Sequence, residues 1–153
     1  MSYSQLFRTT TAAIKPADDT LELESLQQNR EPFTLLFVDD EEGVLSALRR
    51  IFIDENYTIL TATGADKALK ILEERQVHLL ISDHRMPGMN GAELLKVVRE
   101  RWPETIRIML TGYADVNSIM GAVKEGAVYK FITKPWNDED LRLTVALALQ
   151  QYL

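Results

Sequence analysis

From Phe33 onward, short apolar runs alternate along this chain with longer amphipathic stretches. Five apolar runs have the length of strands and lie at residues 34–39, 57–62, 78–83, 106–111 and 128–133. The stretches after them carry apolar residues at helical spacing and lie at 42–55, 65–75, 90–101, 115–125 and 138–151. The pattern therefore predicts five strands, each followed by a helix.

This alternation also predicts the fold class. Strands separated by helices of this length form βαβ units, in which consecutive strands are parallel. The central runs are apolar at nearly every position, which is typical of strands covered by helices on both faces. Right-handed crossovers then give an α/β fold, a doubly wound five-stranded parallel sheet. Several ends carry signals of their own, because Asn90, Asp115 and Thr63 can cap helices and Gly126 can end one.

The first 32 residues differ from the predicted domain at residues 33–153. They are rich in polar and turn-forming residues, such as the run Thr9-Thr10-Thr11. We expect a largely flexible N-terminal extension, in which a short helix can form from about Thr20 to Gln28. The alternative is that Leu21, Leu23 and Leu26 dock on a partner or on a second subunit.

Polar residues stand at or just after the ends of four predicted strands. Asp39 and Asp40 follow the first strand, Asp83 ends the third, Thr111 ends the fourth, and Lys134 follows the fifth. Open α/β sheets bind ligands at the carboxyl ends of their strands, so we expect these side chains to share one crevice.

Three carboxylates in one crevice repel each other unless a cation lies among them, and Mg²⁺ prefers such oxygen ligands. A carboxylate such as Asp83 can also act as a nucleophile toward phosphorus, provided that a metal and a fixed cation stabilise the phosphoryl oxygens. The plainer interpretation is that residues 39–42 are an acidic helix start, favourable beside the helix dipole, and that the segment after Asp83 is an ordinary loop.

Composition narrows the classes of function. The chain has 153 residues, of which 46% are hydrophobic and 26% charged, as in a soluble single domain with a substantial core. The net charge of −6 argues against direct nucleic-acid binding by this domain. The absence of cysteine excludes disulfides, zinc–thiolate sites and cysteine nucleophiles. With neither a membrane-length apolar stretch nor a signal-peptide core, we expect a cytoplasmic protein that does not bind membranes.

From about Phe33 to Leu153 the chain resembles the receiver domain of bacterial two-component response regulators. The resemblance is carried by Asp39-Asp40, by the segment SDHRMPGMNG at residues 82–91, by Thr111, and by YKFITKPW at residues 129–136. It implies the strand order 2-1-3-4-5. It also implies a phosphoacceptor signalling domain that a sensor histidine kinase or a phosphotransfer protein phosphorylates, with self-catalysed dephosphorylation and no enzymatic turnover. The two segments look most like receivers attached to cyclic-dinucleotide phosphodiesterases or to regulators of hydrogenase genes.

The resemblance assigns roles to the polar residues. It implies that Asp83 is the phosphoacceptor and that Asp39 and Asp40 form with it an acidic pocket for Mg²⁺. The backbone carbonyl of Arg85 would be a further metal ligand. The Arg85 side chain would shield or orient the acyl phosphate, or else extend into solvent.

The remaining implied residues form the switch. Lys134 would pair with the phosphoryl group and be joined to Pro135 by a cis peptide, and Thr111 would supply the switch hydroxyl. The switch aromatic residue usually lies three positions before the lysine, which selects Phe131. Phe131 lacks a hydroxyl, however, and the segment before it is one residue longer than in common receivers, so Tyr129 is the alternative. The switch is expected to alter the surface formed by the fourth helix, the fifth strand and the fifth helix.

The last predicted helix has more apolar residues than one face requires. A core-facing stripe is formed by Leu141, Val145, Ala148, Leu149 and Tyr152. Leu143 and Leu147 lie off this stripe, and we expect them to be exposed and to form a homodimer surface, unless neighbouring elements cover them. The helical pattern continues to the last residue, so we also expect that the parent protein continues into an output domain.

Two other functions fit the same fold class. A magnesium-dependent phosphatase with an aspartyl intermediate needs its nucleophile at the end of the first strand and a second acid two residues later, where this chain has Glu41. A flavodoxin-like cofactor-binding module needs a hydroxyl- or glycine-rich phosphate loop after that strand. The acidic residues 39–42 would repel an anion there.

Overall fold

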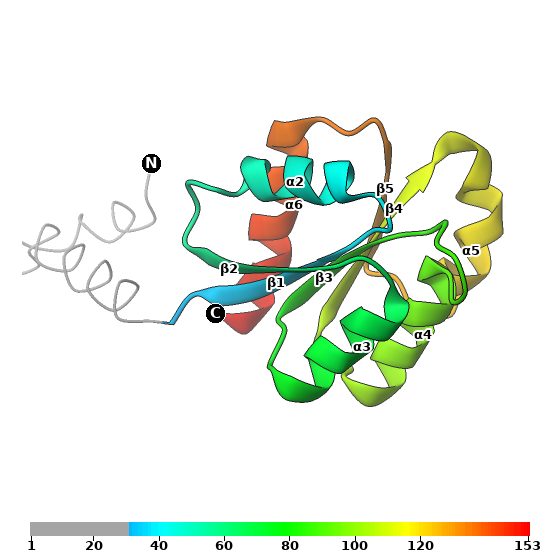
Figure 1. Ribbon diagram of the computed structural model, residues 1–153, viewed down its shortest axis with the longest axis horizontal. Helices are drawn as coiled ribbons and strands as arrows, with labels where there is room; N and C mark the ends of the chain where they lie inside the picture. The colour runs from blue at the N-terminus through cyan, green and yellow to red at the C-terminus, as the bar shows by residue number, and fades with distance from the viewer. Residues whose placement is uncertain (1–30) are drawn as a thin grey trace, which may run out of the picture. The chain divides into compact units, whose positions relative to one another are not determined.

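A computed structural model of the protein describes residues 31–153 (Figure 1). The predicted helix at residues 20–28 and the docking role of Leu21, Leu23 and Leu26 lie outside the described residues.

Strands and helices alternate along the described chain. The strands are β1 (Phe33–Val38), β2 (Tyr57–Ala62), β3 (Leu79–Asp83), β4 (Ile106–Gly112) and β5 (Lys130–Lys134). The helices are α2 (Glu42–Ile51), α3 (Ala65–Glu74), α4 (Gly91–Arg101), α5 (Val116–Lys124) and α6 (Asp138–Leu149), with short 3-10 helices η2 (Tyr113–Asp115) and η3 (Gln150–Tyr152). The strands form one parallel sheet in the order β2-β1-β3-β4-β5, which confirms the predicted fold class and strand order.

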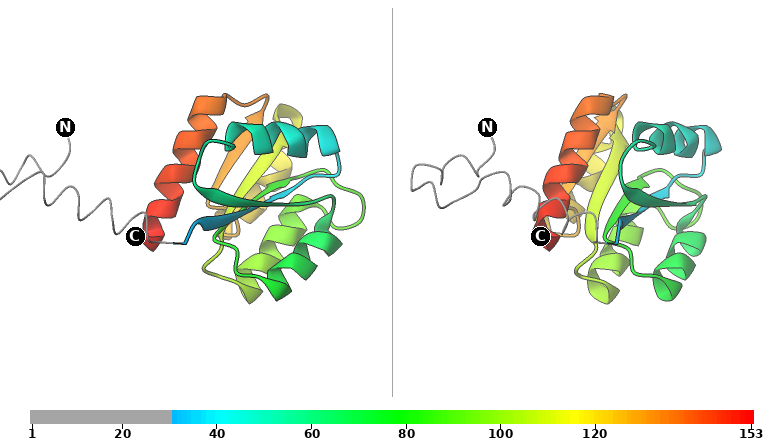
Figure 2. Two further views of the ribbon diagram at one scale, coloured as in Figure 1. Left: turned by 60° about the vertical axis from the view of Figure 1, so that its left-hand side comes forward. Right: turned by 90° about the vertical axis from the view of Figure 1, so that its left-hand side faces the viewer.

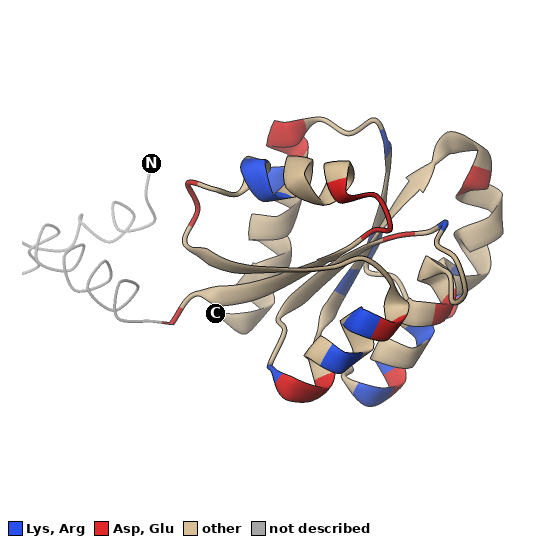
Figure 3. Ribbon diagram, in the orientation of Figure 1, with Lys and Arg blue, Asp and Glu red and all other residues tan. Residues whose placement is uncertain are grey.

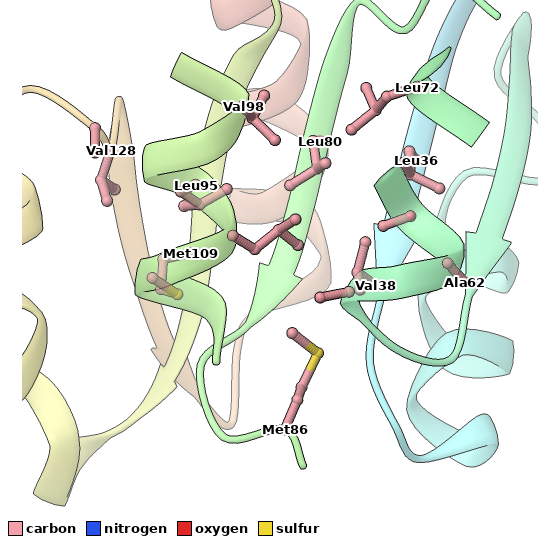
Figure 4. Packing of buried hydrophobic residues seen from close by; sticks show 14 of the residues in the cluster. Leu36, Val38, Ala62, Leu72, Leu80, Met86, Leu95, Val98, Met109 and Val128 are labelled. Carbon is pink, nitrogen blue, oxygen red and sulfur yellow. The ribbon is translucent and has the colours of Figure 1, made fainter. Parts of the chain in front are cut away.

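The sheet separates two hydrophobic layers. Successive residues of β1 point to opposite faces, so Leu35 and Phe37 pack with α2 and α6, whereas Leu36 and Val38 pack with α3, α4 and α5. Figure 2 shows α2 and α6 on one side of the sheet and the other three helices on the opposite side. Figure 4 shows the second layer, in which Leu80 lies between Leu72 and Leu95. Burial on both faces explains why the central strands are apolar at nearly every position.

Two predicted boundaries differ from the structure, and only the first by more than the one or two residues by which helix and strand ends ordinarily vary. The second element, α2, ends at Ile51 rather than at residue 55, because the chain turns from Phe52 toward β2. Strand β5 begins at Lys130 rather than at residue 128. The residues before it close the end of α5, where the Ala127 amide donates to the Ala122 carbonyl oxygen.

The predicted helix signals have mixed outcomes. Asn90 caps α4 in a capping box with Glu93, and Gly126 has φ +81° just after α5, as predicted. The predicted cap at Thr63 is wrong, because Gly64 stands at the N-cap and the Thr63 hydroxyl accepts a hydrogen bond from Lys67. The predicted cap at Asp115 is also wrong, because its carboxylate binds an arginine instead.

Gly91 allows α4 to start directly against the end of β3. A Cβ atom there would collide with the backbone carbonyl oxygen of Asp83, and it would lie 2.8 Å from the Cα atom of His84 and 2.9 Å from the sulfur of Met109. The Gly91 amide also donates to the His84 carbonyl oxygen at 2.8 Å. The start of α4 therefore holds the backbone on which Asp83 stands.

Helix α6 has the predicted division into a buried and an exposed side. Leu141, Val145, Ala148 and Leu149 are buried, whereas Leu143 and Leu147 are 58% and 51% exposed. Between residues 31 and 153, no helix combines the length and the apolar character needed to cross a membrane.

Candidate functional site

Two neighbouring strands bring three carboxylates together at the carboxyl edge of the sheet. In the register of β1 and β3, Val38 lies opposite Ser82, so Asp39 and Asp83 follow at the same level. One oxygen from each of Asp39, Asp40 and Asp83 lies within 4.8 Å of the others. Figure 3 shows the acidic ends of the two strands side by side. Asp39 and Asp83 are buried, whereas Asp40 is exposed.

Lys134 reaches the same place from the end of β5. Its Nζ atom lies 2.8 Å from Asp83 Oδ1 and 3.3 Å from Asp39 Oδ2. The peptide bond between Lys134 and Pro135 is cis, as expected. The structure thus brings together Asp39, Asp40, Asp83 and Lys134, residues that lie as far as 95 positions apart in the chain.

The charges in this cluster are unbalanced. Burial and repulsion from Asp83 raise the pKa of Asp39, although the Glu41 amide and Lys134 donate hydrogen bonds to it and oppose that rise. Burial alone would lower the pKa of Lys134, but its hydrogen bond to Asp83 and the two negative charges outweigh burial, and the pKa is raised. Three carboxylates face one ammonium, a donor set that fits a divalent cation.

Thr111 and Phe131 lie near the cluster on the next two strands. Thr111 is fully buried near the end of β4, and its hydroxyl donates to the Gly112 carbonyl oxygen at 3.3 Å. Phe131 belongs to β5, lies opposite Met109, and packs partly buried against the layer of α3, α4 and α5. Tyr129 precedes β5 and is 50% exposed. Of the two candidate aromatic residues, Phe131 is therefore the more buried.

The Arg85–Asp115 ion pair is a feature that the sequence analysis missed. Arg85 Nε donates to Asp115 Oδ2 and Nη2 donates to Oδ1, both at 2.6 Å. Hydrogen bonds from Arg85 hold the pKa of Asp115 below its usual value, despite the opposing effect of burial. The only signal was an acid just after the fourth strand, and we interpreted it as a helix cap.

The match to known sequences is extensive. The family model of the response regulator receiver domain covers residues 35–146. The chain belongs to the response regulator receiver family. This finding supports a phosphoacceptor signalling role in a two-component system and does not favour the phosphatase or the flavodoxin-like alternative.

Individual relatives agree with the assignment. The receiver domain is 44% identical over 117 residues to the hydrogenase transcriptional regulatory protein HoxA of Cupriavidus necator, a match that covers 76% of this chain and 24% of that protein. The solved signal receiver domain of an HD domain-containing protein from Pseudomonas fluorescens is 36% identical, with a TM-score of 0.76 and coverage of 80% of this chain and 90% of that one. The solved receiver domain of NtrX from Brucella abortus is 30% identical, with a TM-score of 0.71 and coverage of 76% and 98%. The chain spans about a quarter of the length of the curated relatives it matches.

The electrostatics of the cluster predict the effect of Asp39→Asn on stability. Because the pKa of Asp39 is raised above the ordinary value of 3.8, the native state binds more protons than the unfolded state between the two pKa values, and stability falls as pH rises through that range. Without divalent cations at neutral pH, Asp39→Asn should raise the free energy of unfolding by on the order of 1 kcal/mol. The gain should disappear below about pH 4.

Urea unfolding in a chelating buffer at several pH values measures this difference. Asp54→Asn is the control, since Asp54 is an exposed acid in the turn after α2. A less stable Asp39→Asn variant at neutral pH would mean that the pairing of Asp39 with Lys134 outweighs burial and repulsion.

Proposed function

We propose that a histidine kinase or a phosphotransfer protein phosphorylates this receiver domain on Asp83. The observation that carries the proposal is the position of Lys134, whose ammonium lies 2.8 Å from Asp83 Oδ1 at an edge that also holds Asp39 and Asp40. Receiver domains as a family are phosphorylated by histidine kinases, and this cluster supplies both the nucleophile and the fixed cation. The lack of cysteine fits the reducing cytoplasm that we propose for the protein.

The transfer uses the free carboxylate oxygen of Asp83 as nucleophile. That oxygen forms a bond to phosphorus while the phosphorus–nitrogen bond of the donor phosphohistidine breaks, and the electron pair stays on the imidazole nitrogen. The Lys134 ammonium stabilises the negative oxygens of the phosphoryl group as it arrives. Mg²⁺, held by Asp39, Asp40, Asp83 and the backbone carbonyl of Arg85, would offset charge on the phosphoryl oxygens.

The same site can reset the signal. A water oxygen attacks phosphorus, the bond from phosphorus to Asp83 breaks, and the carboxylate is restored as the water proton leaves with inorganic phosphate. We propose this hydrolysis as a self-catalysed step of the domain, without turnover of a separate substrate.

Asp83→Asn tests the phosphoacceptor. After incubation with acetyl phosphate and Mg²⁺, intact-mass spectrometry should find one phosphoryl group on the wild type and none on the variant, because an amide oxygen is a far weaker nucleophile. Asp54→Asn, which removes an exposed acid, should be labelled like the wild type. Equal labelling of Asp83→Asn would overturn the assignment. Hydrolysis of small phosphoesters that needs Asp39 but not Asp83 would favour the phosphatase instead.

We further propose that Thr111 and Phe131 convert the modification into a change of surface. The added phosphoryl group carries a charge of about −2 and three acceptor oxygens. These oxygens would draw the Thr111 hydroxyl away from its 3.3 Å bond to Gly112. The movement would open space for Phe131, which already packs partly buried against the core, and so reshape the surface of α5, β5 and α6.

Thr111→Ala tests the switch. The variant should still bind the phosphoryl mimic beryllofluoride with Mg²⁺. The amide chemical-shift changes in α5 and β5 should fall to less than about half of those in the wild type, because the hydroxyl that would bind the mimic is absent. Thr111→Ser, which keeps the hydroxyl, is the matched control and should respond as the wild type does. A full response in Thr111→Ala would remove Thr111 from the mechanism.

We also propose that α6 forms a homodimer surface. Leu143 and Leu147 project one turn apart from the exposed side of α6, and apolar pairs of this kind bury well against the same pair of a second copy. Relatives such as HoxA are about four times longer than the matched region, so we propose that this surface communicates with an output domain.

Sedimentation velocity with beryllofluoride tests the dimer. The double variant Leu143→Arg, Leu147→Arg should sediment as a monomer under conditions in which the wild type dimerises, because four arginines would face one another across the interface. Its melting temperature should stay close to that of the wild type, since both side chains are exposed. Ile53→Arg changes a leucine-sized exposed side chain elsewhere and should leave the dimer intact. A wild type that stays monomeric would sink the proposal.

A further inference from the structure

The Arg85–Asp115 ion pair joins two segments that border the proposed phosphorylation site. Arg85 lies in the loop after β3, two residues beyond Asp83, and Asp115 ends η2, four residues beyond Thr111. Both oxygens of Asp115 bind the guanidinium, at 2.6 Å each. The pair therefore connects the backbone of the phosphoacceptor to the start of α5.

Arg85 has a second anion within reach. Two residues of extended chain span at most about 7 Å, so the Cα atom of Arg85 cannot lie farther than that from the Cα atom of Asp83. The Arg85 side chain is 75% exposed, which leaves it room to turn. Asp83 already acts on its charge, because the pKa of Arg85 is raised first by Asp115 and to a smaller degree by Asp83.

Asp115 also has a second use for its carboxylate. It stands at the N-cap position of α5, where a carboxylate ordinarily accepts hydrogen bonds from the amides of the second and third helical residues, here Asn117 and Ser118. In the described structure its side chain makes no such bond, and its backbone is helical, with φ −101° and ψ 0°, because η2 runs directly into α5. Capping therefore also requires the Asp115 backbone to turn to an extended conformation. Both of its oxygens are directed to Arg85 instead, so the ion pair and the cap compete for the same carboxylate.

We propose that phosphorylation of Asp83 transfers Arg85 from Asp115 to the phosphoryl oxygens, and that the released Asp115 then caps α5. A phosphoryl dianion binds the planar guanidinium in the same two-pronged manner as a carboxylate and carries more charge. Asp115 loses one set of donors and gains another at the positive end of the helix. The inference rests on the phosphorylation of Asp83 proposed above.

In this exchange, Asp115 is a positioning residue that holds Arg85 away from Asp83 in the unmodified domain. The exchange is separate from the proposed movement of Thr111 and Phe131. It acts on Asp115, which lies at the other end of the segment that begins at Thr111. The unmodified state has the ion pair between Arg85 and Asp115, whereas the phosphorylated state has the pair between Arg85 and the phosphoryl group together with the Asp115 cap. Contacts that differ between two states are the condition for a modification to shift a conformational equilibrium.

Titration with beryllofluoride and Mg²⁺ separates this exchange from a merely structural ion pair. Asp115→Asn should bind the mimic more tightly, by roughly fivefold, because a neutral amide no longer retains Arg85. Arg85→Gln should bind it more weakly, by a similar factor, while its backbone carbonyl stays in place. The double variant should match Arg85→Gln alone, since without Arg85 there is nothing for Asp115 to retain.

Amide hydrogen exchange at Asn117 and Ser118 provides a second readout. In the wild type these amides should become protected when the mimic binds. In Asp115→Asn they should be protected even without it, because asparagine is also a good cap and is no longer held by Arg85. In Asp115→Ala they should stay unprotected in both conditions. Glu73→Gln, which removes a comparable ion pair with Arg101 between α3 and α4, should behave as the wild type does.

The outcomes distinguish this inference from the proposed function. If Asp115→Asn and Arg85→Gln shift the affinity in the same direction, or if their effects add, the pair is structural and the exchange is wrong, while phosphorylation of Asp83 stands. If the wild type fails to bind beryllofluoride, the proposed function fails, and the exchange fails with it.

Discussion

Repulsion among three carboxylates is the constraint on which the functional edge of this domain depends. Asp39, Asp40 and Asp83 are held with oxygens within 4.8 Å of one another, although like charges at such distances in a partly buried place are unfavourable. The fold tolerates them because Lys134 is brought in from β5 and because backbone amides such as that of Glu41 donate to the cluster. The site is thus incompletely neutralised, because it has less positive than negative charge. An uncompensated negative charge of this kind attracts cations, and with a cation present the site can accept an anionic group.

The parallel sheet makes this arrangement possible. Both faces of the central strands are covered, so the strands can be apolar throughout and their polar residues are confined to the ends. Because all five strands run in one direction, these ends meet at a single edge. The hydrophobic layers therefore fix the positions of the charged groups without contacting most of them.

The sequence pattern was sufficient to predict the five-stranded parallel sheet and the convergence of the acidic residues with Lys134, because both depend on patterns with a period of two or 3.6 residues and on the direction of the strands. The strand order was predicted only from the resemblance to receiver domains. Local interactions were predicted less well. Asp115 and Thr63 both have side chains that cap helices, but each binds another partner: Arg85, 30 positions earlier in the chain, for Asp115, and Lys67, one helical turn further on, for Thr63. The early end of α2 is a similar case, since tertiary packing at Phe52 decides where the helix stops. Pairings across the fold were predictable only where strand register determined them.

The close approach at Gly91 joins α4 to β3 more directly than α5 is joined to it. The missing side chain lets the first turn of α4 rest on the backbone of Asp83 and His84, so α4 and the end of β3 form one closely packed body. The segment from Gly112 to Asp115, by contrast, is held to that body through side chains such as Arg85, which can turn about several bonds. The absence of a single methyl group therefore lets backbone contact join α4 to the strand that carries Asp83, whereas the start of α5 is joined to the loop after that strand by an ion pair between side chains.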